Sequence, residues 1–385
     1  MARDKQLVRA AIPNSQRQEL TSLLHNSSAS GLYDQSFAES VLDSLDFDYG
    51  PDVNWFCIDG GTSKLAEAMC GDIKTQPTLN KAVTRIALNR EGGSKTTLSI
   101  DINGSSHPTK YDTVFNTTTL ACAQRMDLIH AELSSAQKDA LRGLHYDAST
   151  KVAIKFKTPW WITKCGITKA GVASCDLPLR RCVYPSYSLG DGPDKPAVLM
   201  VSYTWAQDGQ RIASLIQRDS PAGEDELKVL MLRDIARLHA KSGITVEFLE
   251  NQYDTHHAYD WYQNPYTSGA YAVFGPGQFS NLYPFLTRPA ADGKLHFAGE
   301  ATSTLHPWLA GALQSALRAV IHSLLRFGLQ DAVKEVQKKW GTVGEMELGE
   351  TGTAHLQVIL GCVPPEGLGG GSGDGGQRDD VNLRL

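Results

Sequence analysis

The sequence of 385 residues lacks the patterns that mark several common classes of protein. Its seven cysteines are odd in number and form no C-x-x-C pair, so we expect neither a disulfide framework nor a zinc site, and mostly buried thiols. No segment reaches the roughly 18 apolar residues of a membrane-spanning helix, and the N-terminus has no apolar core of the signal-peptide kind. The net charge of -5 offers no basic surface for nucleic acid. We therefore expect a cytoplasmic globular protein that binds neither membrane nor nucleic acid.

Motifs of several catalytic classes are also missing or weak. No G-x-S-x-G nucleophile elbow occurs. His256 and His257 are adjacent in what reads as a polar loop, without a third ligand at a useful spacing, so no metal site is expected. The only literal G-x-G-x-x-G consists of Gly371, Gly373 and Gly376. It lies in a polar, glycine-rich stretch with no strand before it, so we interpret it as a chance match.

What is present is a mixed α/β pattern without internal repeats. Apolar residues recur at helical spacing over residues 14 to 45. A second helix is expected to begin at Ser63 as its N-cap, and a third over residues 135 to 144. Three strand-like runs, at 82 to 88, 96 to 102 and 111 to 118, favour a β-meander or the edge layer of a sheet.

The region from Lys151 to about Pro289 is richer in aromatic residues. KVAIKFK alternates as a strand, and PWWI, YPSYSL and VLMVSYTW are expected to be further strands or turns. Residues 224 to 241 form the clearest amphipathic helix, with an acidic start and a basic end that suit the helix dipole. ITVEFLE is expected to be a strand. Beyond about residue 341 the composition predicts a flexible tail.

LHFAGE, residues 295 to 300, is an apolar run that ends at Gly299, where the lack of a side chain lets a ligand approach the backbone. Glu300 suits a hydroxyl donor better than a phosphate. The helix that follows opens near Pro307 and Trp308, and its small residues would let it pack closely against another layer. The pattern alone is equally compatible with a helix that merely packs on a sheet, because glycine-rich turns between strand and helix are not diagnostic.

The exact residues of these segments are more informative than their hydrophobic pattern. FAGEATS, followed by HPW and GALQSALRA, resembles the C-terminal flavin-binding segment of the FAD-dependent amine oxidases. WFCIDGGTSKLAEAM is similar to the family's GG-x-x-x-L turn and helix, KAVTRIALN to its adenine-contacting strand, and STKVAIKF to the strand with a lysine near the flavin. RRCVYPSY and WYQNPYTSGAYAVFGPGQF look like substrate-domain segments, closest to fungal L-amino-acid oxidases. The resemblance covers roughly residues 50 to 330.

The resemblance implies a role for each matching residue. Gly299 would let the FAD pyrophosphate approach, Glu300 would hold the ribityl or ribose part, and Val83 would offer only its backbone to adenine. Lys151 would bind a water at flavin N5, while Trp308 and Tyr271 would form opposite walls of an aromatic slot. Tyr184 would donate its hydroxyl to a substrate carboxylate. Leu309, beside Trp308, would also contact the cofactor, whereas Trp160, Trp161 and Tyr187 are interpreted as packing residues.

The chemistry that the resemblance implies suits these residue types. Flavin supplies the electron sink, so the protein mainly orients the substrate and excludes water. An apolar, aromatic-walled slot disfavours the ammonium ion and so helps to keep the amine neutral before hydride leaves. The expected products are an imine, which hydrolyses to a keto acid or aldehyde, and hydrogen peroxide from molecular oxygen.

One family feature has no counterpart. Members begin with a strand, a G-x-G-x-x-G turn and a helix that hold the FAD pyrophosphate, and usually carry an arginine for the substrate carboxylate. We expect this chain to correspond to the later part of such an oxidase. Three interpretations stay open: a subunit completed by an N-terminal chain in trans, a truncated product inactive alone, or a non-catalytic remnant used as a binding or scaffold protein. Exposed sheet edges would favour association, including a homo-oligomer.

These inferences give an α/β (α+β) fold with an incomplete Rossmann-like FAD-binding domain. The predicted divisions are a helical segment at 1–50, the FAD-binding domain at 51–150 and 290–340, a mixed-sheet substrate domain at 151–289, and a flexible tail at 341–385.

Overall fold

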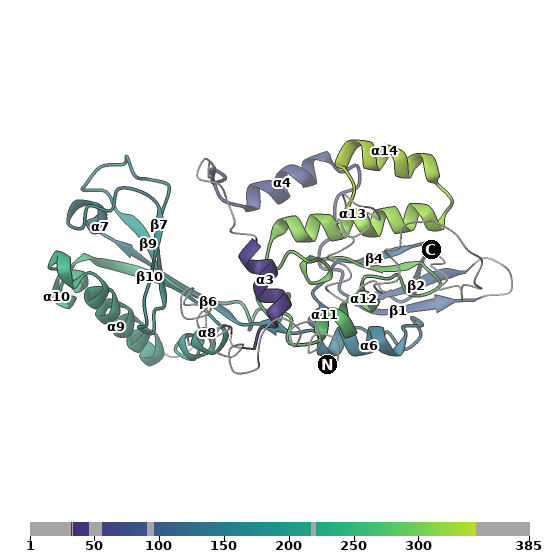
Figure 1. Ribbon diagram of the computed structural model, residues 1–385, viewed down its shortest axis with the longest axis horizontal. Coiled ribbons are helices and arrows are strands. Elements are labelled where there is room, and N and C mark those ends of the chain that lie inside the picture. Colours follow the sequence, from purple (N-terminus) through teal and green to yellow (C-terminus); the bar gives the residue numbers. More distant parts are fainter. Residues whose placement is uncertain (1–31, 33, 46–55, 91–95, 217–220, 344–385) are drawn as a thin grey trace, which may run out of the picture.

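A computed structural model describes residues 32, 34–45, 56–90, 96–216 and 221–343 of the chain. Its helices and strands form two lobes that lie side by side along the longest axis of the molecule (Figure 1). We call residues 149–260 the five-stranded lobe and the rest the meander lobe. The expected α/β fold class is confirmed, because both lobes combine helices with sheet.

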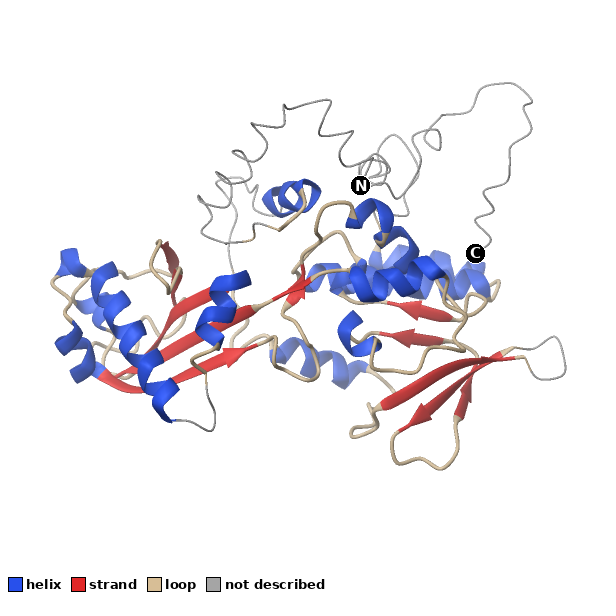
Figure 2. Ribbon diagram, turned by 90° about the horizontal axis from the view of Figure 1, so that it is seen from below, coloured by secondary structure: helices blue, strands red, loops and turns tan. Residues whose placement is uncertain are grey.

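The five-stranded lobe is built on one antiparallel sheet with the strand order β10-β6-β9-β8-β7. The first of its expected strands, KVAIKFK, is confirmed as part of β6, which extends toward the meander lobe (Figure 2). The strands are β6 (Ser149–Phe156), β7 (Gly171–Ser174), β8 (Arg181–Tyr184), β9 (Ala197–Trp205) and β10 (Tyr253–Asp260).

The two faces of this sheet differ. Along β6, Val152, Ile154 and Phe156 are buried, whereas Lys151 and Ala153 on the other face are only partly buried. Helix α9 (Pro221–Leu238) covers the buried face with Leu227, Met231 and further apolar side chains. The helix expected over 224 to 241 is thus confirmed. We call the face opposite α9 the open face.

A β-bulge keeps the two ends of β9 in phase with this division. Val152 pairs with Ser202 and the next residue, Ala153, pairs with Met200, so Val201 is an extra residue in β9. Because side chains alternate along a strand, one inserted residue shifts every later side chain by one position. Tyr203 therefore lies on the open face, opposite Lys151.

The meander lobe contains a three-stranded antiparallel sheet in the order β1-β2-β3, whose first two strands match the expected runs. The third expected run, 111 to 118, contributes only its first residue, Tyr111, to β3. Its second part, β4, leaves the meander and pairs in parallel with β12, so that LHFAGE lies beside YDTVFNTT. The strands are β1 (Val83–Asn89), β2 (Thr97–Ile102), β3 (Thr109–Tyr111), β4 (Val114–Asn116) and β12 (Leu295–Phe297), with a separate pair β5 (Tyr146–Asp147) and β11 (Tyr271–Ala272).

Helices surround these strands. Helix α6 confirms the prediction over 135 to 144, and its Ser134 and Gln137 form a capping box. Helix α14 lies along α13 (Figure 1), and α3 packs on the core of the meander lobe through Ala38 and Leu42. The remaining bounds are α3 (Phe37–Leu45), α4 (Ser63–Asp72), α5 (Leu120–Ala123), α6 (Ser135–Gly143), α8 (Ala206–Ala213), η1 (Ala240–Ser242), α11 (Gln278–Asn281), α12 (Tyr283–Leu286), η2 (Glu300–Thr302), α13 (Leu309–Arg326) and α14 (Gln330–Trp340).

The strand expected at ITVEFLE is wrong, and PWWI, expected to be a strand or a turn, is a helix. ITVEFLE forms helix α10 (Val246–Gln252), because Thr245 caps it by accepting a hydrogen bond from the Phe248 N–H at 3.1 Å. PWWI forms the short helix α7 (Trp160–Thr163). Its two tryptophans are buried and meet edge to face at 5.7 Å, which confirms them as packing residues.

Other local predictions also need correction. The residue that caps α4 is Thr62 rather than Ser63, and α4 has no buried residue. Tyr187 is 66% exposed and so is not a packing residue. His256 and His257 lie on β10 rather than in a loop. Of the six cysteines in the described ranges only Cys182 is buried, so most are not core thiols.

The remaining sequence predictions fall elsewhere. The helical spacing before residue 32, the tail from residue 344 and the glycines of the chance G-x-G-x-x-G lie outside the described residues. Within the described ranges, none of the helices combines the length and the hydropathy needed to cross a membrane.

Gly311 of α13 is closely packed, but against the turn that precedes the helix rather than against the other layer that the sequence predicts. A Cβ added there would lie 2.3 Å from both the Leu305 carbonyl oxygen and the Ser303 Oγ. We expect Gly311→Ala to lower the free energy of unfolding by about 1–3 kcal/mol, because the backbone must move to relieve the overlap. Urea unfolding of the purified protein measures this difference.

The matched control is Gly71→Ala in α4, where no atom lies within 4 Å of the added Cβ. It should leave stability unchanged or raise it by up to about 1 kcal/mol, because alanine favours helix. Equal effects of the two substitutions would contradict the packing argument.

Candidate functional site

The segment from Gly299 to Trp308 connects β12 to α13 through a series of tight turns. Gly299 has φ +140° and no neighbouring atom within 4 Å of an added Cβ, so its surroundings are open. Its N–H donates to Ser315 Oγ at 2.8 Å, which fixes the turn against α13. The Ser303 Oγ in turn donates to the Glu300 carbonyl oxygen at 2.8 Å. These two hydrogen bonds hold the turn in place, and they leave one side of Gly299 accessible.

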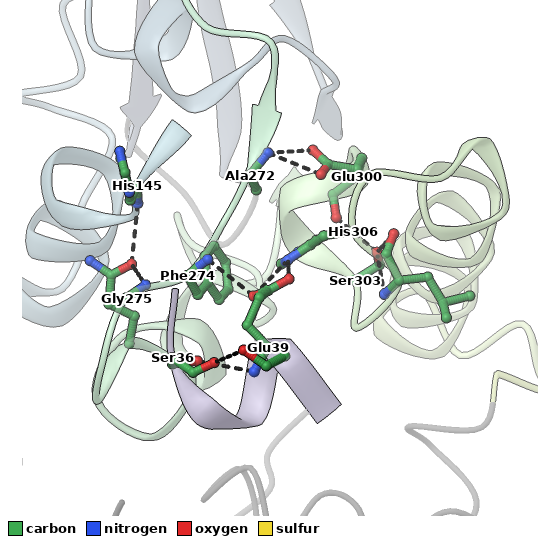
Figure 3. Close-up of polar contacts among 12 residues, drawn as sticks. Ser36, Glu39, His145, Ala272, Phe274, Gly275, Glu300, Ser303 and His306 are labelled. Atoms are coloured by element: carbon green, nitrogen blue, oxygen red, sulfur yellow. Dashed lines mark hydrogen bonds and ion pairs between the residues drawn. The ribbon is translucent and has the colours of Figure 1, made fainter. Parts of the chain in front are cut away.

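Glu300 is a carboxyl group in a mostly apolar setting. It accepts a hydrogen bond from the Ala272 N–H, at 3.0 Å to Oε1 and 3.3 Å to Oε2 (Figure 3). Burial raises the pKa of Glu300 from 4.5 to about 7, while His306 lowers it and Glu39 raises it further. A carboxylate offers about four acceptor positions, so it can still receive a ligand hydroxyl.

Lys151 and Tyr203 meet on the open face of the five-stranded sheet. The Lys151 Nζ lies 4.6 Å from the centre of the Tyr203 ring, and burial lowers the pKa of Lys151 below its usual value. The Arg181 guanidinium lies 4.5 Å from the centre of the Trp205 ring on the same sheet, and burial lowers its pKa as well. Two cations and two aromatic rings therefore gather on this face.

Tyr271 connects this face to Glu300. It lies on β11 opposite Asp147 and immediately before Ala272, the donor to Glu300. Burial raises the pKa of Tyr271 well above 10.0, and the nearby Asp147, Tyr203 and Glu300 raise it further. Tyr271 is thus close both to Glu300 and to Tyr203, the ring that Lys151 contacts, and we call Lys151, Tyr203, Tyr271 and Glu300 the candidate neighbourhood.

Trp308 and Leu309 begin α13, as the sequence predicts: Trp308 is the N-cap residue and Leu309 the first helical residue. Trp308 is half-buried, whereas Leu309 is 58% exposed. Val83 lies at the start of β1 and packs on the core of the meander lobe. It belongs to a different sheet from Lys151 and from Tyr271.

Tyr184 is not brought to the open face. It alternates with Arg181 and Val183 along β8, so it points into the core beneath α9. There its hydroxyl lies 2.6 Å from His239 Nε2, and burial raises its pKa. Donation to a substrate carboxylate would require this buried hydrogen bond to break.

Four residues in or beside the candidate neighbourhood went unnoticed in the sequence: Glu39, Arg181, Tyr203 and His306. Ser36 and Glu39 have the S-x-x-E spacing of a capping box, which signals a helix start but not a site. Arg181 and Tyr203 follow the alternation of their strands, and the bulge at Val201 shifts that alternation. His306 stands in the HPW motif itself.

A depression of about 620 Å³ opens elsewhere in the meander lobe. Its lining includes Arg142, His145 and Tyr262, and none of the residues predicted from the sequence. His256, for its part, is held between Glu224, 2.7 Å from its Nε2, and Tyr253, 2.7 Å from its Nδ1.

Comparison with known proteins places this geometry in a family. The model of the flavin-containing amine oxidoreductases matches residues 4–321. The chain belongs to this family. An L-amino-acid oxidase of the fungus Hebeloma cylindrosporum is 38% identical over 311 residues, which cover 77% of this chain and 48% of that protein. An L-amino-acid oxidase of the fish Siganus canaliculatus is 31% identical over 322 residues, covering 80% of this chain and 54% of that protein.

The chain thus spans about half the length of these curated relatives. Among solved structures, cyclohexylamine oxidase from Brevibacterium oxydans IH-35A has a TM-score of 0.55 at 14% identity, over 86% of this chain and 68% of that one. At that identity the likeness shows that the flavin amine oxidoreductase fold is shared.

FAD is the cofactor of this family, and the described residues fit part of it. The open side of Gly299 and the buried carboxyl of Glu300 suit a hydroxyl-bearing chain, because a hydroxyl donor would satisfy a carboxylate that burial otherwise disfavours. Within the described ranges, no strand is followed by the glycine-rich turn that would hold a pyrophosphate.

The raised pKa of Glu300 makes stability depend on pH. A carboxyl with a folded pKa of about 7 and a usual value of 4.5 stabilises the fold fully below the usual value, and this contribution is lost as pH rises through about 7. We expect Glu300→Gln to match the wild type near pH 5 and to melt at a higher temperature near pH 8, in thermal scans without added FAD.

Glu250→Gln, on an exposed position of α10, is the matched control and should follow the wild-type profile at every pH. Parallel profiles for Glu300→Gln and the wild type would show that Glu300 titrates normally.

Proposed function

We propose that the chain provides the flavin-facing and substrate-binding part of an FAD-dependent oxidase that deaminates an L-amino acid or another primary amine. The observation that carries this proposal is the candidate neighbourhood, whose residues come from separate elements. Relatives named as L-amino-acid oxidases support the reaction class. The products are an imine, its keto acid or aldehyde, and hydrogen peroxide.

When bound, FAD supplies the acceptor for the hydride that leaves the amine-bearing carbon and afterwards passes electrons to oxygen. The chain's own residues prepare the substrate. Tyr203, Tyr271 and Trp308 offer aromatic surface that excludes water and disfavours the ammonium form of the amine. Both tyrosines keep their protons at neutral pH, because burial raises their pKa.

Lys151 is placed to hold a water or to accept a proton at its Nζ. Burial lowers its pKa, so its neutral form is more accessible than that of a lysine in water. The Tyr203 ring beside it stabilises the charged form by a cation–π contact. These opposing influences suit a group that changes protonation during turnover.

Arg181 favours an amino acid over a simple amine. Its partly buried guanidinium stacks on Trp205 near Tyr203 and Tyr271, with Asp43 as a nearby negative charge. A guanidinium binds a carboxylate through two parallel hydrogen bonds, and burial strengthens that attraction. We propose that Arg181 binds the substrate carboxylate, the role that the sequence assigned to Tyr184.

The pyrophosphate of FAD needs a partner outside the described residues. We propose that a glycine-rich N-terminal segment of the family's kind, in a complementing chain, completes the site. The alternative, a non-catalytic binding or scaffold protein, is not favoured, because the relatives that match at 38% and 31% identity are named as oxidases.

The direct test is expression of residues 1–385 followed by a visible flavin spectrum and a peroxide assay across amino acids and amines. We expect FAD to bind weakly to this chain alone, and more tightly with an added G-x-G-x-x-G segment from a relative. Peroxide should form with amino acids once FAD is bound. Failure to bind FAD in either condition would refute the oxidase proposal.

Arg181→Met tests the substrate class. We expect kcat/KM for L-leucine to fall about 10- to 100-fold, the size of a lost charge-assisted hydrogen bond. Oxidation of isoamylamine, which has the same side chain without the carboxylate, should change no more than about threefold. Steady-state peroxide assays on both substrates measure the ratio.

Arg180→Met is the matched control, since Arg180 pairs with Asp208 at 3.2 Å. It should leave the preference between the two substrates unchanged. A parallel loss on both substrates with Arg181→Met would assign that residue to folding rather than to recognition.

A further inference from the structure

The first turn of helix α3 forms hydrogen bonds with the backbone of Phe274. Ser36, just before the helix, donates its N–H to the Phe274 carbonyl oxygen at 2.8 Å, and its Oγ accepts from the Glu39 N–H at 3.0 Å. In a capping box the Glu39 carboxylate would return to Ser36. Here it accepts from the Phe274 N–H at 3.0 Å instead. Both backbone groups of one residue are therefore bound by the first turn of α3.

The same carboxylate binds His306. The His306 Nδ1 lies 3.0 Å from Oε1 and 3.2 Å from Oε2 of Glu39, and the two side chains are 1% and 3% exposed. The imidazole packs against Phe274, with ring centres 4.5 Å apart, and is stacked with Phe279 at 5.9 Å. Burying this carboxylate costs desolvation free energy, which its three close contacts to two distant segments offset. Apolar packing alone does not explain why a charged group stands here.

The two segments that Glu39 joins carry the residues that the resemblance assigns to opposite walls of the flavin site. His306 stands two residues before Trp308, and Phe274 stands three residues after Tyr271. Figure 3 shows how Glu39 reaches both, while Glu300 reaches back from the turn to Ala272. Glu39 and Glu300 therefore bind alternate N–H groups of one extended segment, at Phe274 and Ala272.

We infer that Glu39 is a positioning residue of the flavin site, which holds His306 and Phe274 so that Trp308 and Tyr271 keep a fixed spacing. This inference rests on the proposed function. It makes α3, an element outside the strands and turns that carry the site, a determinant of cofactor binding. Glu39 contacts no reacting atom in this assignment and acts through the residues that it holds.

A merely structural clamp would differ from this in its electrostatic effect. Several groups face the Glu300 carboxyl: Glu39 from α3, His306 from the turn, Tyr146 from β5 and Tyr271 from β11. Both tyrosines stay uncharged at neutral pH because burial raises their pKa. Glu39 is thus the group in this set whose negative charge opposes ionisation of Glu300.

The test uses Glu39→Gln, which keeps the size and one acceptor but removes the charge, with Glu39→Ala as the complete deletion. Hydrogen exchange of the protein without FAD should rise at least tenfold in both segments, 271–275 and 300–308. The melting temperature with Glu300→Gln minus that with Glu300 intact rises with pH. The midpoint, the pH at which half of this rise is complete, should be lower in the Glu39→Gln protein than in the wild type. If Glu39→Ala does not fold, Glu39→Gln carries both measurements.

Ser40→Ala is the matched control on the same helix, because the Ser40 Oγ donates only within α3, to the Ser36 carbonyl oxygen at 3.1 Å. It should change neither segment. Where FAD binds, its Kd should rise about tenfold with Glu39→Gln and stay within twofold with Ser40→Ala.

The inference is overturned if exchange rises in only one segment, or if the midpoint stays at the wild-type pH. Absence of FAD binding by the wild type would count against the proposed function instead, and both measurements without FAD would still decide whether Glu39 couples the two walls.

Discussion

The hydrogen bonds from one short extended segment, residues 271–274, to two buried carboxyls are the interaction on which the rest of the site depends. Alternate N–H groups of an extended chain point to the same side, so Ala272 and Phe274 present two donors in a row. Glu300 and Glu39 take one each, and a buried carboxyl without such a donor would be severely destabilised. The segment therefore fixes the turn before α13 and the start of α3 at once.

In the five-stranded lobe, one sheet likewise has two roles: one face packs in a hydrophobic core, and the other carries polar residues of the candidate site. Val152, Ile154 and Phe156 pack beneath α9, and Lys151 faces away from them. The core holds the strands in register, so the cation and the aromatic ring on the other face need no support from a loop. A site placed on strands is more rigid than one placed on loops.

Much of the fold could be predicted from the sequence, because the meander, β6, α6 and α9 follow simple periodicity. The capping chemistry of Thr245 outweighed the apolar run of ITVEFLE, and the parallel pairing of β4 with β12 depends on residues far apart in the chain. Within the candidate site, Lys151, Tyr271 and Glu300 are predicted through motif resemblance, and their roles stay predictions. Glu39 and Arg181 could not be, because their significance arises only when the two lobes and α3 come together.

The extra residue at Val201 has a consequence for how such a site can change over evolution. On both sides of the bulge β9 alternates between the core and the open face, and after the bulge its open-face residues are Tyr203 and Trp205. Because the bulge keeps each end of the strand on the same two faces, the aromatic residues on the open face can change while the side chains in the core stay the same. A family that acts on amines of many shapes gains from a scaffold in which the substrate-facing surface can vary while the core stays the same.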